Sequence, residues 1–269
     1  EAAIQLDPQD AEAYVNKGIA LLELKQHDSA MEILDQALEI DPNSSYGHNN
    51  KGRVWERLKN PAEAMRCYDK ALELDKHFAV VYRNKGLILE ADREYKQAIL
   101  WHDKALSLYP GYAEAYWSRG DALGAQGKLE EAVENYNMAL ELNPSDECVY
   151  NNRGTALSDQ KKYVQAIQDY NRAIELDPGD PYPYYNKAGD LIRLGRDKEA
   201  SDLYQKVTSL EPNFGSTYTY HGIALGNQKR YKESVRCYRY AIEHEQNHSR
   251  GAHNKGQSVC LGFDGIFIC

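Results

Sequence analysis

The chain has 269 residues, with 32 basic and 41 acidic side chains, and its net charge of -9 gives a pI near 5.4. This acidic balance disfavours nonspecific nucleic-acid binding, because phosphate neutralisation needs a basic face. The five cysteines, an odd number with no Cys-x-x-Cys spacing, indicate reduced thiols in an intracellular, cytoplasmic protein.

A small residue recurs every 34 positions along almost the whole chain. It is found at Gly18, Gly52, Gly86, Gly120, Gly154, Ala188, Gly222 and Gly256. Chance does not hold a register of this kind over so many copies, so the period indicates one structural unit that has been duplicated in tandem.

Each unit is expected to be a helical hairpin. When Ala11 is counted as position 1, position 4 is mostly Tyr, positions 20 and 27 are mostly Ala, position 24 is mostly aromatic and position 32 is often Pro. Two stretches of apolar helical periodicity flank a short polar turn, which predicts one helix over positions 1–14 and another over positions 18–30. Gly at position 8 costs about 1 kcal/mol of helix propensity, so we expect it to allow close packing with the neighbouring helix.

In chain order, residues 1–10 read as the end of the second helix of a truncated repeat. Complete repeats are expected at 11–44, 45–78, 79–112, 113–146, 147–180, 181–214 and 215–248. Residues 249–269 are expected to form the first helix of an eighth repeat, followed by an atypical tail. Asn60, Pro61 and Glu63 predict a capped helix start in the second repeat. Neither end shows a polar cap. The chain is therefore either an excerpt of a longer protein or an array whose ends stack on another copy.

This pattern resembles the tetratricopeptide repeat (TPR) family from Ala11 to Asn254. The resemblance implies an all-α fold, a right-handed α-solenoid superhelix of tandem 34-residue helix-turn-helix repeats. It also implies that the first helices line an inner groove. The basic clamp by which some TPR domains hold chaperone C-termini is absent, because the corresponding residues are Val15, Ile19, Arg53, Arg83 and Leu87.

No catalytic chemistry is indicated. The sequence has no phosphate loop, no dinucleotide fingerprint and no nucleophile elbow, and its histidines do not form a metal-ligand set. No apolar run approaches membrane-spanning length. We therefore expect a protein that is not an enzyme and that has neither a cofactor nor a metal.

One polar residue repeats on the expected inner side. Position 6 is asparagine in six repeats: Asn16, Asn50, Asn84, Asn152, Asn186 and Asn254. An amide offers a donor and an acceptor, so such a series can hold the main chain of a bound peptide. It is similar to the asparagine series in the TPR superhelix of O-linked N-acetylglucosamine transferase. The same amides can instead form hydrogen bonds between adjacent repeats, and both interpretations stay open.

Two side-chain clusters are candidates for sequence preference in the groove. Arg53, Arg57 and Arg83 are expected to converge and to favour a carboxylate or phosphate on a partner. Aromatic anchors are expected further along the chain, at Trp117, Tyr182, Tyr185 and Tyr220. Glu90, Asp121 and Asp159 lie between the two clusters. An ordinary mixed surface is the alternative to a graded groove.

Position 7 is basic in seven repeats: Lys17, Lys51, Lys85, Arg119, Arg153, Lys187 and Lys255. Two interpretations are open. In the first, the aliphatic stems pack along the helix pair while the charges reach water. In the second, the charges form a basic row that attracts an acidic partner.

The leading hypothesis is a noncatalytic scaffold that binds an extended peptide segment of a protein partner in its concave groove. One alternative is a structural array that self-associates through its uncapped ends. Another is that the repeats are the substrate-recognition region of a larger enzyme.

Overall fold

The computed structural model describes the backbone of residues 7–255 and the side chains of residues 7–243, and the regular structure in this part is entirely helical. Its helices are α2 (Ala11–Glu23), α3 (His27–Ile40), α4 (Ser45–Arg57), α5 (Pro61–Leu74), α6 (Ala79–Ala91), α7 (Tyr95–Leu108), α8 (Ala113–Ala125), α9 (Leu129–Leu142), α10 (Glu147–Asp159), α11 (Tyr163–Leu176), α12 (Pro181–Arg193), α13 (Asp197–Leu210), α14 (Gly215–Asn227) and α15 (Tyr231–Lys255). The all-α, tandem-hairpin class expected from the 34-residue period is confirmed.

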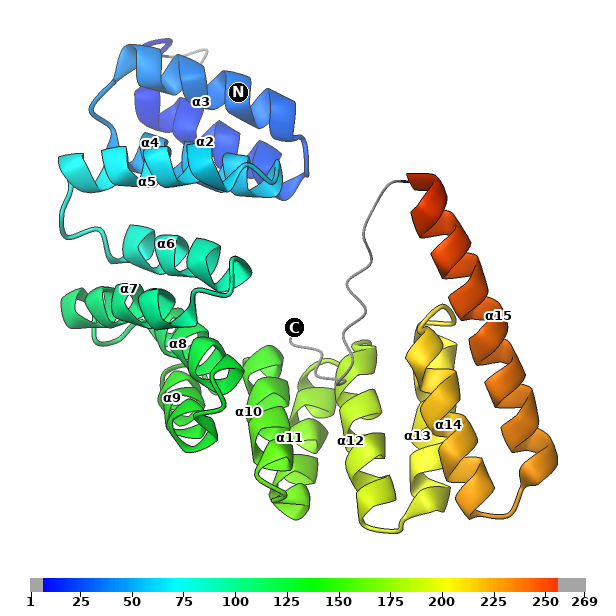
Figure 1. The fold of residues 1–269 in the computed structure, drawn as a ribbon. Helices are drawn as coiled ribbons and strands as arrows, with labels where there is room; N and C mark the ends of the chain where they lie inside the picture. The colour runs from blue at the N-terminus through cyan, green and yellow to red at the C-terminus, as the bar shows by residue number, and fades with distance from the viewer. Residues whose placement is uncertain (1–6, 256–269) are drawn as a thin grey trace. The chain divides into compact units, whose positions relative to one another are not determined.

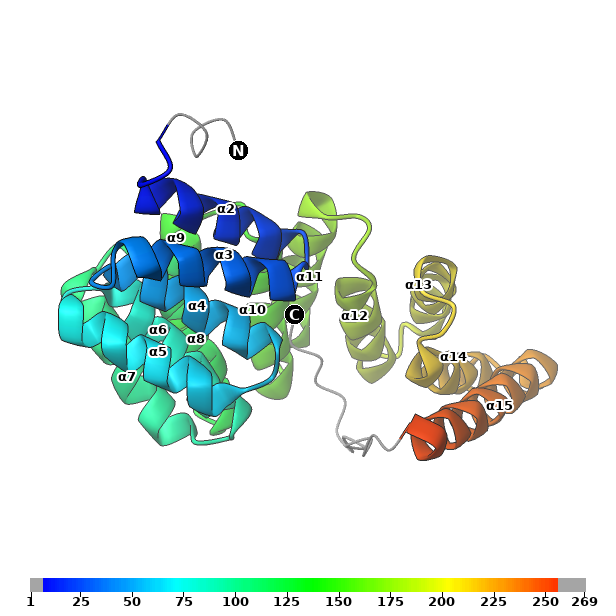
Figure 2. The ribbon, with the colours of Figure 1, turned by 90° about the horizontal axis from the view of Figure 1, so that it is seen from above.

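The chain divides into two compact units, Glu1–Gln126 and Gly127–Cys269. In the first unit the hairpins α2–α3, α4–α5 and α6–α7 stack in order, and α8 packs on α7. In the second unit α9 packs on α10, and the hairpins α10–α11, α12–α13 and α14–α15 follow. The two helices of each hairpin run antiparallel and side by side in both views (Figures 1 and 2).

Every hairpin turn places position 15 in the left-handed backbone region. Gly127 and Gly195 do so with φ of 76° and 72°, and the other five repeats use lysine or arginine with φ between 57° and 62°: Lys25, Lys59, Arg93, Lys161 and Lys229. Non-glycine residues adopt this region at a cost. The same strained turn is therefore the fixed geometry of the repeat, whichever residue occupies it.

The recurring glycine at position 8 makes room for one particular side chain. A Cβ added to Gly86 would lie 2.3 Å from Cε1 of His102, and one added to Gly52 would lie 2.5 Å from Cε1 of Tyr68. Such distances are too short for any real contact, so alanine at Gly52 or Gly86 would require the facing ring to shift. The close packing expected from the sequence is confirmed, and its partner is the position-24 side chain of the same hairpin.

The core consists of one layer between successive helices in each repeat. The position-24 rings of Tyr68, Tyr170 and Tyr204 are buried, as are the alanines at positions 20 and 27. The predicted cap in the second repeat is also present, because the Glu63 amide donates to Oδ1 of Asn60 at 3.3 Å and Pro61 begins α5.

The last helix differs from the expected boundaries. Helix α15 runs without a break from Tyr231 to Lys255, across the repeat boundary expected after residue 248. Position 32, which is proline in five repeats, is Gln246 here, and glutamine does not stop a helix. Residues 1–6 and 256–269 lie outside the described part of the chain. Within that part, no helix is both long and apolar enough to span a bilayer.

Candidate functional site

Two asparagines of the series bond one repeat to the preceding one. Nδ2 of Asn84 donates to Oδ1 of Asn49 at 3.0 Å, and Nδ2 of Asn186 donates to Oδ1 of Asn151 at the same distance. Both bonds join position 6 of one repeat to position 5 of the preceding repeat. Arg83 and Ser118 stand at the equivalent positions 5 and 6 of the third and fourth repeats. Here the side chain at position 5 is the donor, since Nε of Arg83 donates to Oγ of Ser118 at 3.0 Å.

The other asparagines of the series make different contacts or lie in different surroundings. Position 5 before Asn50 is the apolar Val15, so Asn50 donates to the Tyr46 carbonyl at 2.9 Å and accepts from Arg53 at 3.1 Å. Asn152 is buried, Asn16 is exposed, and the side chain of Asn254 lies outside the described residues. Buried, bonded amides are poorly placed to hold a peptide main chain. These contacts favour bonding between repeats, the second of the two interpretations.

The arginine cluster of the first unit surrounds an internal carboxylate. Arg53, Arg57 and Arg83 all act electrostatically on Glu56, whose pKa is raised by burial and lowered in part by these three charges. Arg53 also contacts Glu23 at 3.2 Å. The three arginines thus share an internal carboxylate that interacts with each of their charges.

The basic position 7 forms ion pairs with the preceding repeat. Lys51 pairs with Asp35, Lys85 with Asp69 at 2.5 Å and Arg119 with Asp103 at 2.6 Å. Each pair joins position 7 to position 25 of the repeat before it. In these repeats the charge is therefore paired with an aspartate of the preceding hairpin, a contact that neither of the two interpretations included.

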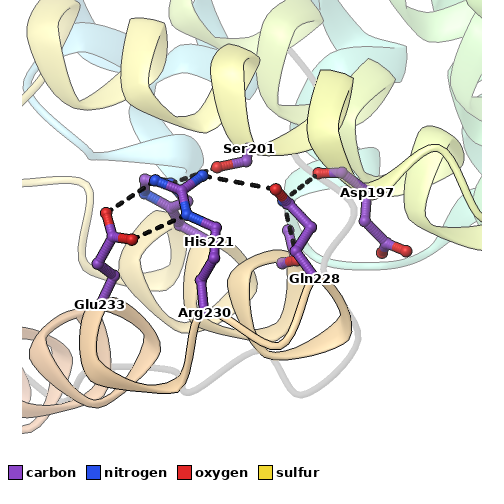
Figure 3. A network of polar contacts seen from close by, with 7 residues as sticks. Asp197, Ser201, His221, Gln228, Arg230 and Glu233 are labelled. Carbon is purple, nitrogen blue, oxygen red and sulfur yellow. Dashed lines mark hydrogen bonds and ion pairs between the residues drawn. The ribbon is translucent and has the colours of Figure 1, made fainter.

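The ion-pair series ends with the fourth repeat. Arg153 of the fifth repeat meets Asn137 at position 25 of the preceding repeat and pairs instead with Asp169 of its own repeat at 2.6 Å. The sixth and seventh repeats lack the pair as well. Position 25 of the preceding repeat is there Asn171 and then Gln205, so the matching carboxylate is missing. His221 takes position 7 of the last repeat, and its Nε2 lies 2.9 Å from Oγ of Ser201. Figure 3 shows this contact beside a second group, in which Arg230 bonds to both carboxylate oxygens of Glu233.

A pocket of about 60 Å³ opens on the second unit, and we call it the tyrosine pocket. It is lined by residues of three successive first helices, α10, α12 and α14, together with one ring each from α11 and α13. The lining residues are Thr155, Ser158, Asp159, Tyr170, Tyr185, Asn186, Gly189, Arg193, Tyr204 and Tyr220. Three of the predicted site residues, Tyr185, Asn186 and Tyr220, thus meet here.

The rings of the tyrosine pocket form one cluster. Tyr185 contacts Tyr204 and Tyr220 edge to face, with centroids 5.8 Å apart in both pairs. Tyr185 and Tyr204 are buried, whereas Tyr220 is 39% exposed and forms part of the rim. Burial raises the pKa of Tyr185 to about 12, so its hydroxyl stays protonated at any physiological pH.

Three charged groups lie at the tyrosine pocket. Nη1 of Arg193 contacts Oδ1 of the fully buried Asp190 at 2.9 Å, and the Ser158 hydroxyl donates to the same oxygen at 2.6 Å. Asp159 stands at the rim, and its pKa is raised by desolvation and lowered by Arg193. The charge at this pocket is therefore mixed, with two carboxylates and one guanidinium.

Other predicted aromatics serve different contacts. Tyr182 packs its edge on Phe214 at 5.6 Å, and Trp117 belongs to the first unit, where its Nε1 is buried without a hydrogen bond among the described residues. Sequence reasoning missed Gly189, Arg193 and Tyr204. Gly189 and Arg193 stand at positions 9 and 13, which the family resemblance places on the inner side. Their positions in the repeat could therefore have indicated them as site residues.

Comparisons with known proteins agree with this architecture. Tetratricopeptide repeat models match residues 1–54, 45–78 and 148–180, and a TPR repeat model matches residues 120–161. Together these matches span more than half of the chain. The chain belongs to the tetratricopeptide repeat family. Repeats of this family generally act as noncatalytic protein-interaction modules, so this TPR chain is a protein–protein interaction scaffold.

Solved TPR structures show the same fold at low identity. PilF of Pseudomonas aeruginosa is 24% identical, with a TM-score of 0.68 over 77% of this chain and 95% of that one. YrrB is 24% identical, with a TM-score of 0.56 over 70% and 97%. The Cut9–Hcn1 structure is 16% identical, with a TM-score of 0.76 over 82% and 44%. No curated protein matches the TPR chain.

Proposed function

We propose that this TPR chain holds an extended segment of a partner protein across α10, α12 and α14, with the tyrosine pocket taking one side chain of that segment. The observation that carries the proposal is the pocket itself, which three successive first helices build together. An exposed tyrosine at the rim of such a pocket, here Tyr220, supplies a large contact area to a bound segment. YrrB, which has a similar fold, is described as a TPR protein with an unusual peptide-binding site.

Three residues that line the pocket are accessible enough to contact the proposed segment. Tyr220 and Arg193 are exposed at the pocket, and Asn186 is half-buried there. The buried amides of Asn50, Asn84 and Asn152 support the stack instead. The proposed segment is therefore anchored by side chains in the tyrosine pocket, and main-chain contacts with the asparagine series have a minor part.

Selection from a displayed random-peptide library against the immobilised chain tests this proposal. Wild-type protein is expected to enrich a set of related peptides, and Tyr220→Ala is expected to weaken their binding about tenfold, as removal of an aromatic anchor does. Tyr109→Ala is the matched control, because Tyr109 is 56% exposed in the first unit, away from the pocket. Equal binding by both variants, or no enrichment by the wild type, contradicts the proposal.

Self-association is a second candidate, and α15 favours it. Tyr231, Val235, Tyr238 and Ile242 are all more than a third exposed and recur at spacings of four, three and four residues. This spacing places them on one stripe of the helix. A hairpin of a second copy could cover the stripe as a following repeat would. Light scattering across a concentration series checks this, and a monomer at all concentrations excludes it.

A further inference from the structure

The two exposed charged groups at the tyrosine pocket differ in how well they are neutralised. Arg193 lies 2.9 Å from a carboxylate oxygen of Asp190, so its charge is offset within its own helix. Asp159 makes no hydrogen bond and no ion pair within the described residues, and it interacts with Arg193 only through space. The charge left without a direct partner at the pocket is therefore negative.

The surroundings of Asp159 favour a cation as well. Asp159 is the last residue of α10 and Arg193 the last of α12, so the C-terminal ends of two helices point toward the rim. These ends carry partial negative charge. The rings of Tyr185, Tyr204 and Tyr220 add faces that attract cations.

The floor of the tyrosine pocket also has an open acceptor. Tyr204 is 1% exposed and lines the pocket, yet its hydroxyl makes no hydrogen bond among the described residues. Gly189 leaves the space beside it empty, since a Cβ there would stand 3.5 Å from Nη1 of Arg193 and 3.8 Å from the Tyr204 hydroxyl. A hydroxyl that lines such a space can accept a hydrogen bond from a guest.

We propose that the tyrosine pocket binds a lysine or arginine side chain of the partner segment, with Asp159 as its counter-ion. The aliphatic stem packs against Tyr185 and Tyr220, and an N–H group donates to Asp159 or to the Tyr204 hydroxyl. This assignment rests on the proposed peptide-binding function and names the anchor residue of the bound segment. It departs from the basic clamps that hold acidic C-termini, because the unpaired charge here is a carboxylate.

Peptides selected by the wild-type chain supply the probe. They are expected to share one Lys or Arg, and replacing it by norleucine is expected to weaken binding about tenfold in fluorescence anisotropy. Asp159→Asn is expected to weaken the basic peptide five- to tenfold and to leave the norleucine peptide unchanged. Asp202→Asn is the control, because Asp202 is exposed on α13 and does not line the pocket.

Gly189→Ala gives a second variant that separates binding from folding. Its methyl group occupies the floor of the pocket at ordinary contact distances and raises helix propensity, so the fold is kept while the basic peptide binds more weakly. Selected peptides that share an acidic residue or no charge, or an Asp159→Asn variant that binds both peptides like wild type, overturn the inference and leave the proposed function standing. Failure to select any peptide overturns both.

Discussion

The side-chain amide of Asn84 donates to the side-chain oxygen of Asn49, 35 residues earlier, at 3.0 Å. Both residues are buried, and each lies on the first helix of its own repeat. The bond thus joins α4 to α6 through two buried side chains. Asn186 and Asn151 repeat the relationship in the second unit.

Asn84→Ala is expected to lower the free energy of unfolding by about 1–3 kcal/mol, because it leaves the buried oxygen of Asn49 without its donor. Urea denaturation followed by far-UV circular dichroism measures the loss. Asn16→Ala makes the same change at an exposed asparagine of the first repeat and is expected to stay within about 0.5 kcal/mol of wild type. Losses of similar size in both variants would show that the bond to Asn49 contributes nothing.

Gly86→Ala is expected to destabilise the first unit by several kcal/mol, although alanine is the better helix former. The added methyl group would stand 2.3 Å from the fully buried ring of His102, which contacts Glu90 at 2.5 Å. Gly226→Ala is the control, because its methyl group would meet Ser234 Oγ at an ordinary 3.5 Å. The midpoint of thermal unfolding measures the effect. An unchanged midpoint for Gly86→Ala would mean that the His102 ring can move aside.

Lys85→Met is expected to cost more stability than Asp69→Asn. Lys85 is almost fully buried, pairs with Asp69 and stands 4.0 Å from the ring centre of Trp101, so its replacement removes an ion pair and a cation–π contact. Asp69 is half-exposed, and its loss alone is expected to cost about 1 kcal/mol or less and to shrink in high salt. Urea denaturation at low and high salt measures both. The exposed pair Lys70–Glu73 provides the control, with Lys70→Met near wild type.

His221 is expected to make the last hairpin less stable in acid. Burial, followed by the charge of Arg230, lowers the pKa of His221 below its ordinary value of 6.5. The folded state therefore favours the neutral ring, and this contribution is complete above pH about 6.5 and is lost as the pH falls through the lowered pKa.

Urea midpoints measured from pH 7.5 to 5 are thus expected to fall more steeply for wild type than for His221→Gln. His77→Gln, at an exposed histidine, controls for the removal of one titrating ring. Parallel curves for wild type and His221→Gln would remove the role given to His221.

Much of the fold could be predicted because it depends on the period alone. Gly86 and Gly154 recur in register, and a helix without a side chain at one point must face something large there, whatever its identity. The continuation of α15 past residue 248 was not predicted. Gln246 stands where five earlier repeats have proline, but α5 ends at Leu74 although Lys76 takes this position in the second repeat, so the missing proline alone does not account for the longer helix.

The candidate site was predicted in part. Tyr185, Asn186 and Tyr220 could be chosen as inward positions, since the hairpin register fixes which side of a first helix they occupy. Gly189 and Tyr204 were not predicted. In the sequence a glycine and a position-24 ring indicate helix packing, and only the structure shows that both line a pocket.

The sequence by itself determined the hairpin, the number of copies and the small residues that let them stack, because these follow from spacing along one chain. Only the tertiary structure decided what the polar side chains do. An asparagine or a lysine can bond equally well to a ligand, to water or to the next helix, and the choice depends on which group stands opposite it. At Asn84 and Lys85 that group is a side chain of the preceding repeat, whereas at Asp159 no bonded partner is present in the described chain.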